Sequence, residues 1–355
     1  MHSRSPRVAG AGLLALDVII SDSDRTDALT FAGGTCANVL SILSFLRWTA
    51  TPIGFIGDDP AGRRVLADLA TAGVQAAHLI QHAEWSTPVF IQTLERTQDG
   101  PAKHSFTNAT SCPHCGHPVA ENVPHSMIGT TPIRRFTEPE RIDVFFMDRL
   151  SDDILSLAES ARQKGALIFY EPSAKADAHC WQDAFDLVDI VKYSADRFAV
   201  EDLQPFITRK TRNLWEVQTE GAKGLRYRRH GSHPTSSTRW ITSAAIPAAR
   251  VIDTCGAGDW CSAGLIHGLL TFTRKRESGS FGRAVQFGQL LAAWACAFVG
   301  ARGAMYCNDR QSTWAAIKSV VDSRQMDLSR MPLASQSTPP TLSDMHSCVA
   351  TFGES

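Results

Sequence analysis

The residues best suited to chemistry lie late in the chain, in a glycine-rich turn that ends in an aspartate. The turn reads Asp253-Thr254-Cys255-Gly256-Ala257-Gly258-Asp259, and apolar residues at helical spacing follow it. A turn that opens a helix leaves several N–H groups unpaired, and the helix dipole adds partial positive charge there. Because Gly256 and Gly258 let the backbone approach a ligand without a Cβ in the way, the turn predicts a phosphate-binding site.

Asp259 is the group in this turn that can accept a proton. It stands in the first helical turn, where a carboxylate is stabilised as the anion, so we expect it to be a weak base. Phosphoryl transfer needs positioning and charge neutralisation more than a strong base, and an aspartate that accepts an alcohol proton late is sufficient. The sequence therefore predicts Asp259 as the catalytic base of a transfer to an alcohol. A lone GxGD motif also fits a capping aspartate beside a structural turn.

A second glycine motif stands at the start of an earlier helix. Gly33 and Gly34 permit close approach of a ligand, and Asn38 offers a donor and an acceptor at the same helical end. Polyol hydroxyls need both kinds of partner. Taken alone, the motif fits a tight strand-to-helix turn with a satisfied asparagine equally well.

The elements that must position these motifs alternate along the chain. Strands that alternate with amphipathic helices predict a mainly parallel sheet with both faces covered, and ligands at the carboxyl ends of its strands. Residues 88–94 and 104–107 predict a hairpin around a Gly-Pro turn. Apolar periodicity predicts helices that begin near residue 35 and that cover 151–164, 258–271 and 281–299, and strands at 52–56, 142–147, 166–170, 187–191 and 214–218.

The motifs, their order and the intervening hairpin resemble the PfkB, or ribokinase-like, family of carbohydrate kinases over residues 8–305. The resemblance implies an α/β fold, a three-layer α/β/α sandwich with a mainly parallel central sheet and a small β lid. Its kinase domain would cover residues 1–330, with the lid from 15–31 and 86–107. The polar stretch 108–140 has no sustained period and is interpreted as an inserted loop region, and the polar residues 331–355 are interpreted as a tail. The residues that carry it are Gly33 to Asn38, Gly57 to Gly62, Gly73-Val74, Asp253 to Asp259 and Ala263-Gly264.

The same resemblance implies the roles of individual residues. Asp259 would be the base, and Gly256, Ala257 and Gly258 would form the anion hole. The sugar would be contacted by Asp17, Gly33, Gly34 and Asn38, and the nucleotide by Thr219, Gly221, Gly224, Asp253 and Thr254. Members of the family use ATP and Mg²⁺, and many pair as homodimers through their lids.

Two segments depart from the family pattern. After the strand near residue 190, Ser194 and Arg197 occupy the positions of an Asn and a Glu that organise Mg²⁺ through water, and Asp196 or Glu201 could substitute. In the inserted region, Cys112, Cys115 and His117 could supply three of the four ligands of a structural Zn²⁺, with His104 or His125 as the fourth. Free thiols in a surface loop are the other interpretation of that region.

The composition of the chain narrows the classes of molecule that it could bind. The chain has 35 Lys and Arg against 36 Asp and Glu, so no net field favours nucleic acid or an anionic membrane surface. Its longest apolar run is shorter than the roughly 20 residues that span a bilayer. Nine scattered cysteines favour reduced thiols. We therefore expect a cytoplasmic protein whose partner is a small sugar or sugar-like substrate.

Two other functions compete with a sugar kinase. Gly10 to Ala15 fit the dinucleotide fingerprint GxGxxA of an NAD-linked oxidoreductase, but that pattern needs a helix directly after it. The altered magnesium stretch and the insert would also suit a catalytically weakened family member that binds a sugar or a nucleotide and regulates a partner.

Overall fold

A nine-stranded sheet forms the centre of the protein in the computed structural model, which describes residues 4–21, 24–95, 103–108, 141–209, 213–231, 239–274, 279–323 and 325–336. The order is β13-β12-β11-β10-β9-β8-β1-β4-β5, and the seven strands from β11 to β5 run parallel while β12 and β13 are antiparallel. The strands are β1 (Arg7–Ala11), β4 (Thr49–Gly57), β5 (His78–His82), β8 (Val144–Met147), β9 (Leu167–Tyr170), β10 (Ile190–Ser194), β11 (Leu214–Thr219), β12 (Gly224–His230) and β13 (Ile241–Ala244).

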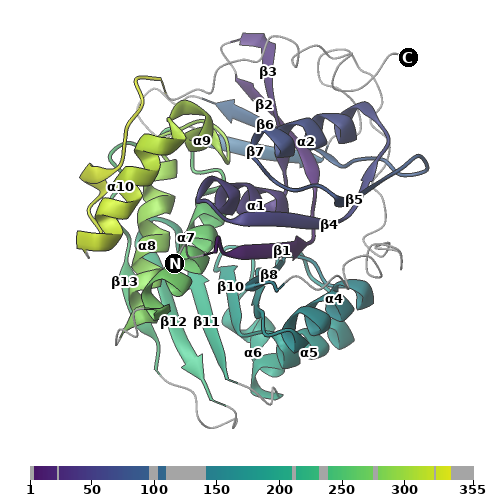
Figure 1. The fold of residues 1–355 in the computed structure, drawn as a ribbon, viewed down its shortest axis with the longest axis vertical. Helices are drawn as coiled ribbons and strands as arrows, with labels where there is room; N and C mark the ends of the chain where they lie inside the picture. Colours follow the sequence, from purple (N-terminus) through teal and green to yellow (C-terminus); the bar gives the residue numbers. More distant parts are fainter. Residues whose placement is uncertain are drawn as a thin grey trace.

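Helices cover both faces of this sheet, because alternate strand residues enter two separate apolar clusters. Phe146 packs in the cluster that contains α1 and α7, whereas Phe145 packs in the cluster that contains α4 and α5. The two helical layers lie on opposite sides of the strands (Figure 1). One layer contains α1 (Thr35–Phe45), α2 (Pro60–Thr71), α7 (Ala257–Arg274) and α8 (Ser280–Ala295), and the other contains α4 (Asp152–Gln163), α5 (Ala178–Leu187) and α6 (Val200–Arg209).

A second, four-stranded sheet lies beside α2 (Figure 1). We call it the lid sheet; its order is β3 (Asp24–Gly33), β2 (Ala15–Ser21), β6 (Val89–Glu95) and β7 (Lys103–Asn108). The predicted hairpin is confirmed, since β6 and β7 are antiparallel. The predicted fold class, an α/β/α sandwich with a small β lid, is confirmed as well. The dinucleotide fingerprint fails, because strand β2 follows Gly10 to Leu14 where a helix is required.

The elements differ from the predicted ones in two respects. The strand predicted at 187–191 is β10 at Ile190–Ser194, because the apolar residues before it close helix α5. Helices α5 and α6, and also α9 (Gly303–Cys307) and α10 (Arg310–Ser323), were not predicted. The shift of β10 places Lys192 inside a buried strand.

Some of the predicted segments lie outside the described residues. These include Cys112, Cys115 and His117, so the zinc interpretation stays a prediction. The boundaries of the kinase domain also stay predictions. Met331, where the tail is predicted to begin, is buried in the core, and the carbonyl oxygen of Pro332 accepts a hydrogen bond from Trp294 Nε1 at 2.6 Å.

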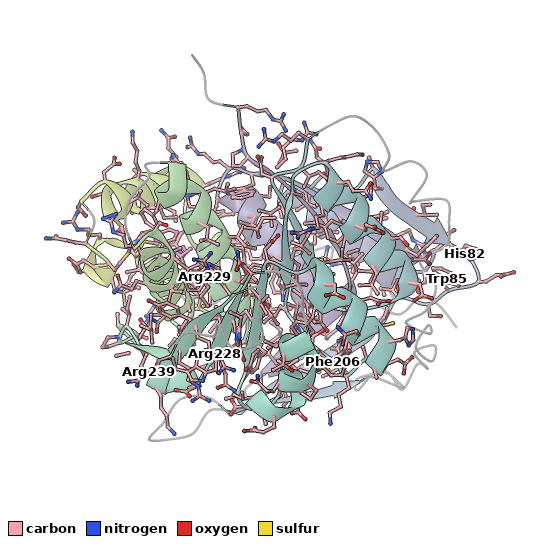
Figure 2. All side chains as sticks on the ribbon, turned by 90° about the horizontal axis from the view of Figure 1, so that it is seen from below. His82, Trp85, Phe206, Arg228, Arg229 and Arg239 are labelled. Carbon is pink, nitrogen blue, oxygen red and sulfur yellow. The ribbon has the colours of Figure 1, made fainter. Side chains whose placement is uncertain are left out.

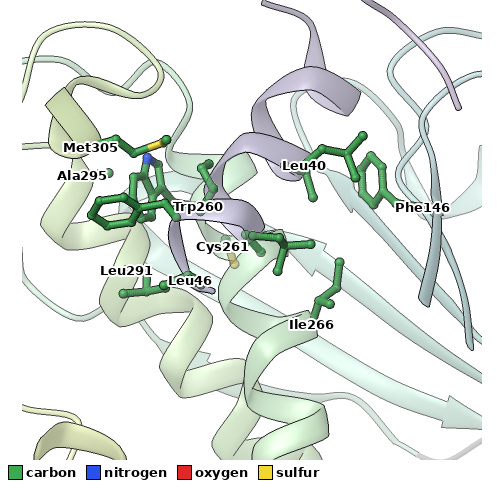
Figure 3. Close-up of a cluster of buried hydrophobic side chains, with 14 of the residues drawn as sticks. Leu40, Leu46, Phe146, Trp260, Cys261, Ile266, Leu291, Ala295 and Met305 are labelled. Atoms are coloured by element: carbon green, nitrogen blue, oxygen red, sulfur yellow. The ribbon is translucent and has the colours of Figure 1, made fainter. Parts of the chain in front are cut away.

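Helices α1 and α7 pack side by side through the apolar cluster of Figure 3. Trp260 is fully buried there, stands edge-on to Trp294, and donates from Nε1 to the carbonyl oxygen of Ala301 at 3.0 Å. A Cβ added at Gly264 would come within 2.7 Å of Gly288 Cα, so α7 and α8 approach closely. These contacts anchor the start of α7.

The two edges of the central sheet carry different side chains. Arg228 on β12 and Arg239 lie toward one end of the molecule, and His82 and Trp85 beside β5 lie toward the other (Figure 2). Arg228 pairs with Glu216 at 2.6 Å, and His230 is buried against the same carboxylate. The positive charge of Arg228 is therefore partly neutralised within the fold.

Candidate active site

The early and late glycine motifs meet at one hydrogen bond. Asn38 Nδ2 on α1 donates to Asp259 Oδ2 on α7 at 2.8 Å, across 221 residues of sequence. Both side chains are buried, and Asn38 Oδ1 has no hydrogen-bond partner among the described residues. A buried amide oxygen without a partner is costly, so this atom suits a hydroxyl of a ligand.

The glycines at the start of α1 are required by neighbouring protein atoms. A Cβ at Gly33 would lie 2.0 Å from Cγ of Asp17, so the Asp17 carboxyl group rests against this backbone. Gly34 has a φ of 86°, and a Cβ there would lie 2.4 Å from the carbonyl oxygen of Leu13. The structure thus brings Asp17, Gly33, Gly34 and Asn38 together, as the site prediction needs. Their contact with a sugar stays a prediction.

The turn before α7 is held by Asp253. Its Oδ1 accepts from the Cys255 N–H at 2.8 Å, and its Oδ2 accepts from the Gly300 N–H at 2.8 Å and from Gln92 Nε2 of the lid sheet at 3.0 Å. The Asp253 carboxylate therefore links the lid sheet to the turn. The predicted contacts of Asp253 and Thr254 with a nucleotide stay predictions.

The anion hole predicted at Gly256 to Gly258 has the required backbone form. Gly256 has a φ of 72°, and a Cβ there would lie 2.5 Å from Ala301 Cα, so only glycine fits. The N–H groups of Gly258 and Asp259 pair with no acceptor among the described residues. A Cβ at Gly258 would meet nothing nearer than 3.9 Å. A helix start with unpaired N–H groups suits an anion, and anion binding by this turn stays a prediction.

Burial changes the expected basicity of Asp259. Burial, helped by the charge of Glu171, raises the pKa of Asp259 to about 8, although Asn38, Lys192 and Arg197 oppose the rise. The expectation of a weak base was wrong, because burial outweighs the helix start. Asp17 behaves similarly: burial raises its pKa to about 7 against the guanidinium of Arg302.

Three buried residues next to the turn were missed by the sequence reasoning. Lys192 Nζ lies 2.5 Å from Glu171 Oε1 and donates to the carbonyl oxygen of Gly258 at 3.1 Å, and Ser262 Oγ donates to Glu171 Oε2. One signal was available, since a lysine within the apolar run Ile190 to Tyr193 needs a buried partner. The partner itself could not be read from the sequence.

The predicted nucleotide turn follows β11, next to β10. Thr219 ends β11 in register with Ser194 of β10. Gly221 and Gly224 have φ values of 58° and 105°, and a Cβ at Gly224 would lie 2.3 Å from the carbonyl oxygen of Ser243. The turn is therefore a glycine-dependent bend at the same sheet edge as Asp259. Its contact with a nucleotide stays a prediction.

The magnesium positions lie in the turn after β10. Asp196 and Arg197 are exposed, and the Asp196 N–H donates to Ser194 Oγ at 3.2 Å. An exposed carboxylate at this edge fits a Mg²⁺ ion that keeps most of its waters. The positive charge of Arg197 lowers the pKa of Asp259. The magnesium positions stay predictions.

An α/β sandwich with an aspartate and free amide groups at the start of a late helix is the arrangement expected of a phosphotransferase that acts on an alcohol group. A family model described as pfkB family carbohydrate kinase matches residues 20–311, which is most of the chain. The chain therefore belongs to the pfkB family of carbohydrate kinases and is a sugar kinase.

The chain is similar in sequence to curated fructokinases and similar in fold to solved sugar kinases. The chain is 24% identical to the fructokinase of Escherichia coli over 334 residues, which cover 85% of this chain and 97% of that protein. The structure of Arabidopsis thaliana ribokinase with ribose and ATP superposes with a TM-score of 0.63 and 17% identity, over 90% of this chain and 99% of that one. The structure of Vibrio cholerae fructokinase with fructose, ADP and calcium superposes with a TM-score of 0.60 and 19% identity, over 84% of this chain and 96% of that one.

The helices in the described part of the chain are all too short or too polar to span a bilayer.

Proposed function

We propose that this enzyme transfers the γ-phosphoryl group of ATP to a hydroxyl of a sugar or sugar-like molecule, with Asp259 as the base. The observation that carries the proposal is the Asn38 to Asp259 hydrogen bond, because it joins a polyol-binding motif to an open helix start. A proton acceptor and a set of amide donors then lie within one turn of helix. In-line transfer between a hydroxyl and a terminal phosphate needs that juxtaposition.

Different residues of the site would bind the sugar, accept the proton and stabilise the transferred phosphoryl group. Asp17, Asn38 and the Gly33-Gly34 backbone would hold the sugar, with Asn38 Oδ1 accepting from one of its hydroxyls. Asp259 would take the proton of the attacking hydroxyl, and the unpaired N–H groups of the turn, among them those of Gly258 and Asp259, would stabilise the charge on the transferred group. Mg²⁺, when bound with ATP, would neutralise the phosphates, and Asp196 is the carboxylate that fits it through water.

Fructose is the first acceptor to test, because the E. coli relative is named a fructokinase. Ribose, sugar acids and nucleosides follow in the panel. Release of ADP is measured with each compound in the presence of ATP and Mg²⁺, and Asp259→Asn serves as the control. One acceptor should be turned over by the wild type and not by the variant.

Two outcomes would contradict the proposal. Full turnover by Asp259→Asn would remove Asp259 as the base. If no acceptor is phosphorylated but one raises the melting temperature, the chain acts as a binding protein, since a ligand that binds only the folded state stabilises it. A cytoplasmic location and pairing of two chains through the lid sheet stay predictions alongside this function.

A further inference from the structure

Lys192 is a charged side chain placed where the sequence of β10 would otherwise be apolar. Only 1% of its surface is exposed. Ile190 faces the apolar cluster that contains α1 and α7, so strand alternation puts Lys192 on the same side, below the start of α7. A buried ammonium group is costly unless it is paired and hydrogen-bonded. Its partners therefore show what it does.

Those partners connect the sheet to the first turn of α7. Glu171, just after β9, accepts from Lys192 Nζ at 2.5 Å with Oε1, and Ser262 of α7 donates to its other oxygen. Lys192 Nζ also donates to the carbonyl oxygen of Gly258 at 3.1 Å. That carbonyl belongs to the same peptide group as the free N–H of Asp259. A cation on the oxygen polarises the group and strengthens its N–H as a donor.

We propose that Lys192, held in place by Glu171, is a positioning residue that fixes the Gly258-Asp259 peptide and balances the charge beside the catalytic aspartate. The inference rests on the proposed function of this site. The pair carries no net charge, so it orients the turn without making the helix start more negative toward phosphate.

Charged groups face Asp259 from several elements. Glu171 from β9 raises the pKa of Asp259, while Lys192 from β10 and Arg197 after β10 lower it, and Asn38 of α1 lowers it by hydrogen bonding. Cys255, in the turn itself, is a neutral thiol, because burial raises its pKa well above its usual range. Removal of Lys192 alone should therefore raise the pKa of Asp259, and removal of the Glu171 charge alone should lower it.

The test uses two variants with opposite expected effects, Lys192→Met and Glu171→Gln. The pKa of Asp259 is followed by NMR of carboxyl-labelled aspartate in the unliganded protein, with Asp259→Asn to assign the signal. We expect shifts of about one pH unit, upward for Lys192→Met and downward for Glu171→Gln. The acid limb of kcat/KM should move the same way, by about tenfold at a fixed pH on the limb.

Two further variants separate positioning from folding. The double variant Lys192→Met/Glu171→Gln leaves no unpaired buried charge, so it should fold even where a single variant does not. Its Asp259 pKa should return toward the wild-type value, while its plateau kcat should stay at least about tenfold lower because the Gly258 carbonyl oxygen is no longer held. Arg162→Met, which breaks an ion pair at the opposite end of β10, should change neither quantity.

The results distinguish this inference from the proposed function. If both single variants titrate like the wild type, or if the double variant keeps the wild-type plateau, the inference is overturned while the kinase assignment stands. Full turnover by Asp259→Asn would overturn both. Opposite shifts with a lowered plateau in the double variant would support the role of Lys192.

Discussion

Asp259 should be mostly protonated in the free enzyme at neutral pH, and its titration should control the rate of phosphoryl transfer. With a pKa of about 8, only about one-eleventh of the enzyme carries the carboxylate at pH 7, and about ten-elevenths carries it at pH 9. A base must be unprotonated to accept the hydroxyl proton. We therefore expect kcat/KM to rise about tenfold between pH 7 and pH 9.

The assay is release of ADP at limiting sugar, measured from pH 5.5 to pH 9.5 at constant ionic strength. The profile of kcat/KM reports the ionisation of groups in the free enzyme. Burial raises the pKa of Asp17 to about 7, so Asp17 should contribute a second, lower step if its charge affects sugar binding. The change with pH should then appear in the KM for the sugar as well as in kcat.

The control is Asp259→Asn, which keeps the volume and the hydrogen bond to Asn38 but cannot accept the proton. Its kcat should be lower by a factor of about 10² to 10⁴, and the step near pH 8 should vanish. A wild-type limb at pH 4 to 5 would show that burial does not raise the pKa of Asp259 as the geometry requires. A step near pH 8 that persists in the variant would assign it to another group.

Three further predictions concern stability. Folding raises the pKa of three buried aspartates, so the stability they contribute is complete below about pH 4 and is lost as pH rises through about 6, 7 and 8. In that order, the three groups are Asp148, Asp17 and Asp259. We therefore expect the melting temperature to fall from pH 5 to pH 9, and to fall less steeply in Asp259→Asn. Gly256→Ala should lower the free energy of unfolding by about 1–3 kcal/mol and abolish turnover, because φ is 72° and Ala301 leaves no room for the methyl group; a stable, active variant would contradict this. Gln92→Leu should lower the free energy of unfolding, measured by urea titration, by about 1.5–3 kcal/mol, because it removes the lid-sheet donor to the buried Asp253 carboxylate. An unchanged urea midpoint would show that the lid sheet and the turn are not coupled.

Sequence patterns predicted the parts of the site that depend on local backbone chemistry. Glycines at Gly33, Gly34 and Gly256 mark positions where a Cβ would collide or where φ is positive, and such positions leave a direct trace in the sequence. The order of strands and helices also predicted the parallel sheet. Because ligands bind where parallel strands end, a shared site at that edge of the sheet was expected, and Asn38 does meet Asp259 in the structure.

The remainder depends on contacts between distant segments. The end of α5 and the start of β10 share one apolar run, and no local pattern marks where the helix stops. Lys192 lies on β10 and Glu171 lies 21 residues before it, just after the neighbouring strand β9, so their pairing appears only when β9 and β10 are in register. The pKa of Asp259 is likewise a property of its buried surroundings, which a sequence motif does not encode.

The first turn of α7 must meet two opposed electrostatic demands. It must attract a phosphate, which requires positive potential, and it must hold a carboxylate basic enough to take a proton, which positive potential prevents. Burial of Asp259 resolves the conflict by raising its pKa to about 8 without adding negative charge in front of the anion hole. The ion pair of Lys192 and Glu171 carries no net charge and can orient the turn from the sheet side. A lone lysine would lower the basicity of Asp259, and a lone glutamate would repel the phosphate.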